Sequence, residues 1–288
     1  MNKRVISVCG DAQAEALALV LQSLPALRDE FEIVYAAACV RQRVPGRLAC
    51  AFSYEQYGAA SPNSSKPPKS CRKIVFPPMR LNLLWPMGAP NPYNLPEPPD
   101  FPLGRYPFGD QFIMSCIKRG VPADDIMRHY RAPQWSGSWP NLDRLFQDES
   151  AALSALDAKC DVKIGSFVLK HFRKKRLFWA ANAPTNALLA ELVFRTLHAS
   201  FGPGMETDRA AIGGALANFG GRDVLGGAAA PVHPLVAQHF RLEWYNPSER
   251  YACFGGSPRT FDEYFREMIE HATARHAASA ASESLGEK

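Results

Sequence analysis

The sequence lacks the patterns that mark several common classes of protein. Its seven cysteines form neither a CxxC pair nor a metal-finger spacing, and their odd number favours reduced thiols over a disulfide framework. Its seven histidines form no HExxH pair, so we expect no metal. GxSxG, P-loop and GxGxxG motifs are also missing, and the common hydrolase and nucleotide-binding signatures therefore give no support.

Long apolar runs are missing too. The run at residues 5–9 is far too short for the hydrophobic region of a signal peptide, and no segment approaches the roughly 18 apolar residues that span a bilayer. The net positive charge is modest, because +5 on 288 residues is spread thinly and leaves no broad basic stripe of the kind that binds nucleic acid. We therefore expect a cytoplasmic protein with no membrane span and no nucleic-acid partner.

One compact basic cluster is the exception to this thin spread of charge. A small polyanion, such as the phosphates of a nucleotide, would suit such a cluster, and a solvated helix face is an equally good explanation. The sequence leaves both interpretations open. The cluster consists of Lys170, His171, Arg173, Lys174, Lys175 and Arg176.

The composition, 47% hydrophobic and 21% charged, is that of a soluble globular enzyme. Residues 5–9 have the apolar pattern of a strand buried on both faces of a parallel sheet, and Gly10 and Asp11 end it. A helix then runs to Pro25, and strands are predicted at residues 31–37 and 48–53. This order predicts a right-handed βαβ unit, and we expect one α/β domain over residues 1–288 with a small, largely parallel sheet.

Residues 59–108 contain 13 of the 24 prolines, which remove amide donors and break helices. We therefore interpret this segment as a long surface insertion or lid, not as sheet interior. Its aromatic residues argue against a disordered linker, because such side chains usually pack onto the rest of a protein.

Helices dominate the remainder of the chain. Thr185 is a natural N-cap, and Thr260 and Glu263 have capping-box spacing. The pattern predicts helices at residues 109–119, 122–130, 141–158, 161–175, 186–200 and about 260–278, a strand at 176–181, a loop at 202–227 and a frayed tail at 280–288.

The end of the first strand is the first candidate site. Ligands of open α/β sheets collect at the carboxyl ends of the strands, where a helix N-terminus offers free amides. Gly10 allows a tight turn there, and Asp11 and Gln13 can bond a ligand, although Asp11 can equally cap the helix. We expect Cys9, at the strand end, to be a core residue more readily than a nucleophile.

A second strand-to-helix junction at residues 182–186 is the other candidate. Two such junctions in one sheet can face a common crevice, and Asn182 and Asn186 can hold a substrate carbonyl or hydroxyl. Asn and Thr are also ordinary caps at such turns. His129 is a candidate general base, although surface or core placement is more common for a single histidine.

Three stretches, in this order, resemble the WcbI-type capsular polysaccharide biosynthesis proteins. Residues 8–17 resemble the family's Gly-Asn-Cys-Gln opening and the helix after it, and residues 178–186 resemble its aromatic strand ending in Asn-His-Pro-Thr-Asn. Residues 231–237, Tyr251 and residues 260–264 are similar to its C-terminal Pro-x-Val and Glu-Tyr region. Residues 54–56 and 74–77 extend the resemblance over most of the chain.

The resemblance implies an acetyltransferase, that is, a cytoplasmic protein that binds coenzyme A or acetyl-CoA and O-acetylates a capsule sugar precursor on a core partly similar to SGNH-type hydrolases. Under it, His129 or Asp11 serves as base and Gln13 joins the catalytic group, while Arg80 and the basic cluster meet phosphates. The residues assigned to coenzyme A are Gly10, Ala12, Arg80, Lys170, Arg173, Lys174, Asn182, Thr185 and Asn186.

The chain departs from the family pattern at three positions. Ala12 stands where the family has cysteine, Ala183 where it has histidine, and Asp11 where it has asparagine. Two alanines cannot form a nucleophile and base pair. The alternatives are direct acyl transfer with another base, a non-catalytic protein that binds coenzyme A or a glycan, and an SGNH-like esterase, which lacks a serine at position 12.

Overall fold

The computed structural model describes residues 3–37, 50–59, 70–101, 103–132, 139–202, 209–219, 223–227, 229–251 and 257–286. The chain divides into two compact units. The first comprises residues 1–81 and 148–226, and the second comprises residues 82–147 and 227–288. Two compact units can belong to one folding domain, so the single domain expected over residues 1–288 stays a prediction.

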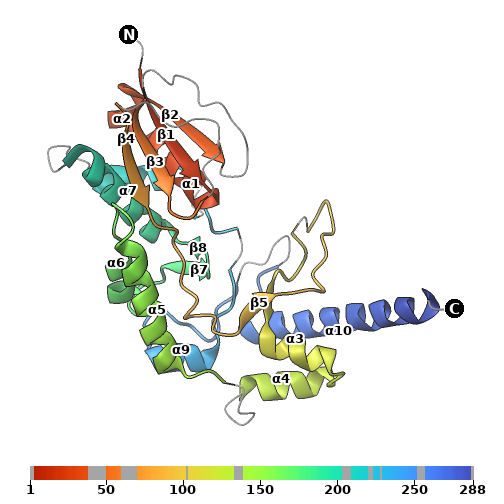
Figure 1. Ribbon diagram of the computed structural model, residues 1–288. Coiled ribbons are helices and arrows are strands. Elements are labelled where there is room, and N and C mark those ends of the chain that lie inside the picture. The colour runs from red at the N-terminus through yellow and green to blue at the C-terminus, as the bar shows by residue number, and fades with distance from the viewer. Residues whose placement is uncertain are drawn as a thin grey trace. The chain divides into compact units, whose positions relative to one another are not determined.

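A parallel sheet forms the centre of the first unit (Figure 1). Its strands in the described residues are β1 (Arg4–Gly10), β2 (Phe31–Ala37), β3 (Cys50–Gln56) and β4 (Arg72–Phe76), in the order β2-β1-β3-β4. All three strand pairs are parallel. The predicted α/β class with a parallel sheet is therefore confirmed, and the predicted strand at residues 31–37 has the observed bounds.

Helices cover this sheet. α1 (Ala12–Ser23) connects β1 to β2 and packs on both, α2 (Pro25–Arg28) follows it, and α7 (Asn186–Phe201) packs against α1 and β4 (Figure 1). The apolar spacing in α1 and α7 places their leucines in the core, where each contributes about 1.5–3 kcal/mol by leaving water. The fully buried leucines of the two helices are Leu17, Leu21, Leu188, Leu189, Leu192 and Leu197.

β4 corrects the interpretation of residues 59–108 as an insertion outside the sheet. The five residues of β4 contain no proline, and Pro77 and Pro78 follow directly after it. Prolines flanking a strand remove no ladder hydrogen bond from it, so β4 can pair with β3 as the edge strand. Residues 60–69 and 102 of the predicted insertion lie outside the described residues.

Three other boundaries differ from the prediction. Residues 202–227 include helix α8 (Arg209–Ala217), which buries Ile212, Ala215 and Leu216. Helix α6 (Gly165–His171) is shorter than the predicted helix at residues 161–175. The last helix, α10 (Phe261–Gly286), continues past the predicted end near residue 278, because its alanine-rich second half has high helix propensity.

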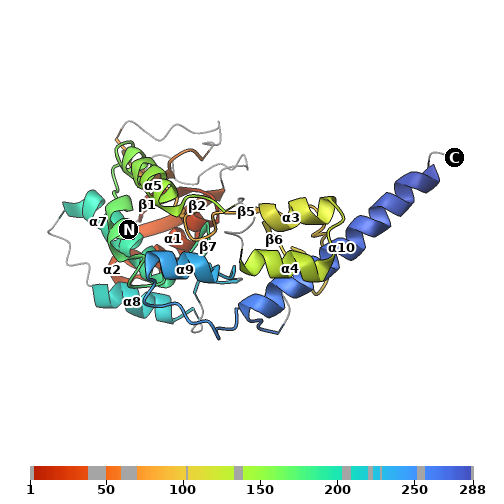
Figure 2. The same cartoon turned by 90° about the horizontal axis from the view of Figure 1, so that it is seen from below.

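The second unit is built on a helical core. α3 (Gln111–Lys118), α4 (Ala123–Arg131) and α10 lie side by side, and α10 extends beyond the other two (Figures 1 and 2). Apolar residues of all three helices, such as Ile113, Ile126 and Met268, form one buried cluster. The unit also contains the antiparallel pair β5 (Gly88–Pro90) and β6 (Phe108–Asp110), helix α9 (Pro234–Phe240) and the first part of α5 (Leu142–Asp157).

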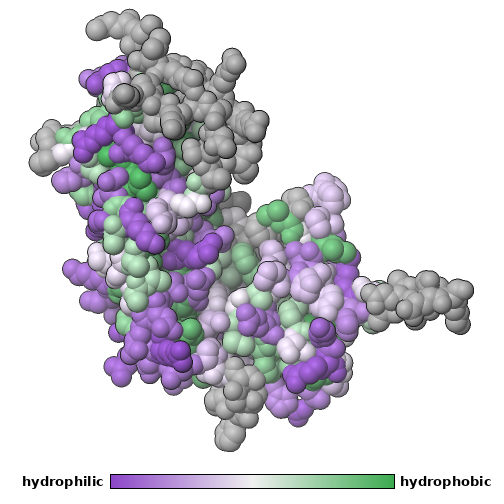
Figure 3. Space-filling view, viewed as in Figure 1, coloured by the Kyte–Doolittle hydropathy of each residue, from purple (hydrophilic) through white to green (hydrophobic). Residues whose placement is uncertain are grey.

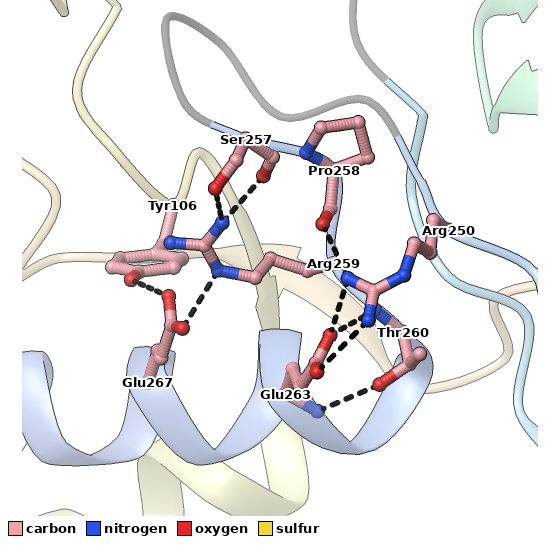
Figure 4. A network of polar contacts seen from close by, with 8 residues as sticks. All are labelled: Tyr106, Arg250, Ser257, Pro258, Arg259, Thr260, Glu263 and Glu267. Carbon is pink, nitrogen blue, oxygen red and sulfur yellow. Dashed lines mark hydrogen bonds and ion pairs between the residues drawn. The ribbon is translucent and has the colours of Figure 1, made fainter.

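The predicted capping box at the start of α10 is confirmed. The amide of Thr260 donates to Glu263 Oε2 at 2.9 Å, and the amide of Glu263 donates to Thr260 Oγ1 at 3.3 Å. The neighbouring residues form two ion pairs, Arg250 with Glu263 and Arg259 with Glu267, and the Tyr106 hydroxyl also donates to Glu267 (Figure 4). These contacts join Arg250, Arg259 and Thr260 to the first turns of α10.

The surface over α5 is strongly hydrophilic (Figure 3). Four polar residues in its first two turns are exposed, namely Asp143, Arg144, Gln147 and Asp148. No helix among the described residues combines the length and apolar character needed to cross a membrane.

Candidate functional site

The junction between β1 and α1 is built from a close backbone approach and a helix cap. A side chain at Gly10 would place its Cβ 2.4 Å from Gln56 Oε1, so only glycine fits there. Asp11 caps α1, because its Oδ1 accepts from the Gln13 amide at 2.8 Å, and its own amide donates to Gln56 Oε1 at 2.8 Å. Gln56 ends β3, so the carboxyl ends of two neighbouring strands meet at this junction.

The Gln13 side chain ties three separate segments together. It is 5% exposed, and its Nε2 donates to the Met79 carbonyl and the Asn182 carbonyl, both at 2.8 Å. Its Oε1 accepts from the Met79 amide at 2.7 Å. Gln13 therefore satisfies three backbone groups, and this network holds residues 79 and 182 against the start of α1.

The second predicted junction lies in a small hairpin. β7 (Phe178–Ala180) pairs antiparallel with β8 (Ala183–Pro184), so the expectation that this strand belongs to the parallel sheet is wrong. The chain reverses within two residues after Ala180, and these short strands find their hydrogen-bond partners in each other. The Gln13 bond to Asn182 nevertheless brings the two predicted junctions together.

The predicted site residues in and after this hairpin differ in whether their polar side chains are exposed to a ligand. Asn182 is exposed at the turn, and its neighbour Ala183 is half-buried. Thr185 occupies the predicted N-cap position of α7, but its side chain makes no capping bond; it is 6% exposed, and its hydroxyl donates to the Arg176 carbonyl at 3.3 Å. Asn186 Oδ1 accepts from the Val224 amide at 2.9 Å. Thr185 and Asn186 therefore hold local structure, while Asn182 faces solvent.

Four predicted residues are exposed around the buried Gln13 amide: Asp11, Ala12, Arg80 and Asn182. Arg80 follows Met79 directly, and the next amide, that of Leu81, donates to the Ala181 carbonyl at 2.8 Å. The rim thus offers a carboxylate, a guanidinium and a carboxamide beside the N-terminus of α1. The guanidinium, the carboxamide and the helix N-terminus can bind an anionic or carbonyl group.

Cys9 does not supply the nucleophile that position 12 lacks. Its side chain is half-buried, and burial, followed by the nearby Glu55 carboxylate, raises the pKa of its thiol above the ordinary value. The thiolate is the reactive form of cysteine, and a raised pKa leaves little of it at neutral pH.

The basic cluster begins in the last turn of α6 and continues past the end of this helix. Lys170, Arg173 and Lys174 are exposed, whereas the Arg176 guanidinium lies over the Trp179 ring at 4.7 Å. The Arg176 carbonyl accepts the Thr185 hydroxyl, so Arg176 joins the cluster to the hairpin. The described contacts bring Arg176 to the candidate site and leave the other three on the surface.

His129, the predicted base, is exposed on α4 in the second unit. The other predicted residues, from Gly10 to Asn186, lie in the first unit. Sequence reasoning gave Gln56 no role in the site, because the predicted third strand ended at residue 53 and residues 54–56 entered only through the family resemblance. No group of His, Cys, Asp and Glu suited to a metal ion occurs in the part of the chain that the structure describes.

The second unit contains a buried polar group that the sequence did not single out. Asp110 is 5% exposed, caps α3 through its Oδ1, and accepts from the Tyr130 hydroxyl at 3.0 Å through its Oδ2. Burial raises the pKa of this carboxyl to about 6 against hydrogen bonds from Ile113, Tyr130 and Phe112 that lower it. The helix predicted at residues 109–119 included Asp110, so its role as the cap of α3 was not predicted.

The substitution Asp110→Asn is expected to remove a pH-dependent loss of stability. Because the pKa of Asp110 is higher in the folded than in the unfolded protein, its protonation stabilises the folded protein. This contribution to the unfolding free energy is fully present below about pH 4 and is lost as the pH rises through about 6. The difference between a pKa of about 6 and the ordinary value of an aspartate corresponds to about 3 kcal/mol. Urea unfolding between pH 4 and 8 should show the variant gaining stability relative to the native protein over this range.

An exposed carboxylate is the matched control for this experiment. Asp124→Asn, in the first turn of α4, should leave the pH dependence of the unfolding free energy as in the native protein. Equal pH dependence in Asp110→Asn and the native protein would contradict the assignment of the pH effect to Asp110.

Comparison with known proteins identifies a family and a fold. The family model described as polysaccharide biosynthesis enzyme WcbI matches residues 5–202. A solved structure described as WcbI, a novel polysaccharide biosynthesis enzyme, is similar with a TM-score of 0.69 at 21% sequence identity, covering 96% of this chain and 93% of that one. That structure is the native protein without a disulfide bond between coenzyme A and a cysteine. No curated protein sequence matches the chain.

Proposed function

The chain belongs to the family of the polysaccharide biosynthesis enzyme WcbI, and on that premise we propose that it binds coenzyme A or acetyl-CoA and O-acetylates a sugar precursor of a capsular polysaccharide. The observation that carries the proposal is the junction tied by Gln13, where residues 10–13, 79–81 and 181–183 converge at the carboxyl end of the sheet. Such a place is where open α/β sheets bind ligands.

The exposed groups of this junction suit a thioester. The N-terminus of α1, with the Ala12 amide, offers positive partial charge to a thioester oxygen, and the Asn182 carboxamide offers a second donor. Arg80 and the exposed cations Lys170, Arg173 and Lys174 match the phosphates of coenzyme A.

Direct transfer needs no nucleophile from the protein. A sugar hydroxyl forms a bond to the thioester carbon, the carbon–sulfur bond breaks, and coenzyme A leaves as its thiolate. The hydroxyl proton passes to a base, and the exposed Asp11 carboxylate is the ionisable group at the junction that fits this role. This route is compatible with alanine at positions 12 and 183.

Calorimetric titration with coenzyme A and with acetyl-CoA, at low and at moderate salt, tests the proposal without knowledge of the acceptor. Saturable binding that weakens with salt is expected, because the phosphates release counterions on meeting Lys and Arg. Absence of binding at both salt concentrations would overturn the proposal.

Replacing both Arg173 and Lys174 by alanine is expected to weaken coenzyme A binding by about tenfold at low salt and by less at higher salt. The reason is that both side chains are exposed cations, and each loss of a positive charge weakens the attraction for phosphate groups. Calorimetry at two salt concentrations measures the effect.

The matched control for this double variant is the pair Lys118→Ala and Arg119→Ala, at the exposed end of α3 in the second unit. It removes the same charge and should leave coenzyme A affinity unchanged. Equal affinities of the two double variants would remove the basic cluster from the site.

A second candidate function is non-catalytic binding of coenzyme A or a glycan. It is favoured by Ala12, which is exposed at the start of α1 and presents no reactive group to a ligand there, and by Ala183. Binding of acetyl-CoA without transfer to any sugar acceptor, and without hydrolysis, would select this function. Hydrolysis without an acceptor would instead favour an esterase.

A further inference from the structure

The second unit contains a cavity whose lining lies entirely within that unit. Its volume is about 30 Å³, which is room for one or two water molecules. Five aromatic side chains contribute to its wall, and the ionisable groups on it are Asp110, Tyr130 and His233. The aromatic residues are Trp85, Phe108, Tyr130, Trp139 and Phe265.

His233 is already fully used by the protein. It is 4% exposed, its Nδ1 accepts from the Leu235 amide at 3.1 Å, and its Nε2 lies 2.9 Å from the Tyr130 carbonyl. An Nδ1 that accepts an amide proton carries none, so Nε2 carries the proton and donates it to the carbonyl. Burial also lowers the pKa of His233, and the ring is therefore neutral and has no group left for a ligand.

Asp110 and Tyr130 keep acceptor capacity. Asp110 Oδ1 accepts from two amides, those of Phe112 and Ile113, whereas Oδ2 accepts only the Tyr130 hydroxyl among the described contacts. A carboxylate oxygen has two lone pairs, and a hydroxyl that donates can also accept. No described Lys or Arg forms an ion pair with Asp110. A ligand in this cavity must therefore bring hydrogen-bond donors.

We propose that this cavity receives the edge of a sugar ring, with one or two hydroxyls donating to Asp110 Oδ2 and Tyr130 Oη and a C–H face against Trp85 or Trp139. Sugars combine hydroxyl donors with apolar C–H faces, and the cavity combines acceptors with aromatic walls. The small volume admits the edge of the ring, where hydroxyls replace water, and leaves the rest at the opening. This inference rests on the proposed function in that the acetyl acceptor is a sugar.

Saturation-transfer NMR with methyl hexopyranosides of the gluco, galacto and manno configurations tests the site on the full chain. We expect transfer to the ring protons of at least one of them. In Asp110→Asn and in Trp139→Ala, we expect the affinity for that glycoside to fall by about tenfold or more. Asp110→Asn keeps the Oδ1 cap of α3, and circular dichroism verifies that each variant is folded. Trp179→Phe, in the first unit, removes a tryptophan outside the cavity and should bind as the native protein does.

Two results would overturn this inference: no transfer from any of the three glycosides, or transfer that is unchanged in folded Asp110→Asn and Trp139→Ala. Transfer to tetramethylammonium in place of the glycosides would also do so, because the site would then select a cation. Coenzyme A titration of the same samples separates the two proposals. Coenzyme A binding without glycoside binding removes the sugar site alone, and glycoside binding without coenzyme A removes the proposed acyl donor alone.

Discussion

The variant Ala12→Cys is expected to form a mixed disulfide with coenzyme A, at a rate at least about tenfold above any cysteine of the native protein. Position 12 is exposed at the first turn of α1, and the partial positive charge of a helix N-terminus lowers the pKa of a thiol placed there. The thiolate attacks oxidised coenzyme A, one sulfur–sulfur bond forms as another breaks, and one coenzyme A leaves as thiolate. Intact-mass spectrometry over time measures the adduct.

A cysteine elsewhere on the same helix is the matched control for Ala12→Cys. Leu19 is 39% exposed in α1, away from the helix N-terminus, so Leu19→Cys gives an accessible thiol without the helix-end charge or the proposed binding site. The two variants should react similarly with a small neutral disulfide after correction for thiolate content, and only Ala12→Cys should prefer oxidised coenzyme A. Equal preference in both variants would contradict the placement of coenzyme A at this junction.

The variant Gln13→Met is expected to lose about 3 kcal/mol or more of unfolding free energy. Methionine has nearly the same length but leaves the Met79 amide and the Met79 and Asn182 carbonyls without their partner in a buried place. Each buried unsatisfied group costs about 1–3 kcal/mol. Urea unfolding measures the loss, and coenzyme A binding should weaken with it, because residues 79–81 and 182 are no longer held at α1.

Gln22→Met is the matched control for Gln13→Met. Gln22 lies on the same helix and its Nε2 donates to the Ile33 carbonyl at 3.1 Å, but the residue is exposed, so water can replace this bond. Its loss of unfolding free energy should stay below about 1 kcal/mol. Similar losses in the two variants would show that Gln13 does not hold the three segments together.

Local patterns predicted the first half of the sheet well. The apolar run before Gly10 and the helical spacing after it identify β1 and α1, and residues 31–37 were predicted as the strand that the structure contains. The proline content of residues 59–108 misled the interpretation of β4, because a five-residue strand between prolines is too short to alter the composition of a 50-residue segment. α8 was missed for a related reason. Its two glycines lower the helix propensity, and packing of its buried side chains in the first unit stabilises the helix nevertheless.

The sequence by itself determined the α/β class, the capping box at Thr260 and, through short motifs in order, the WcbI family, because all of these depend on residues close together in the chain. Only the tertiary structure decided that Gln13 binds residues 79 and 182, that β7 pairs with β8 instead of joining the sheet, and that Asp110, Tyr130 and His233 line one cavity. These contacts join residues up to 169 positions apart. Backbone carbonyls and amides that a distant side chain satisfies carry no mark in the sequence, and the packing of the core determines which of them meet.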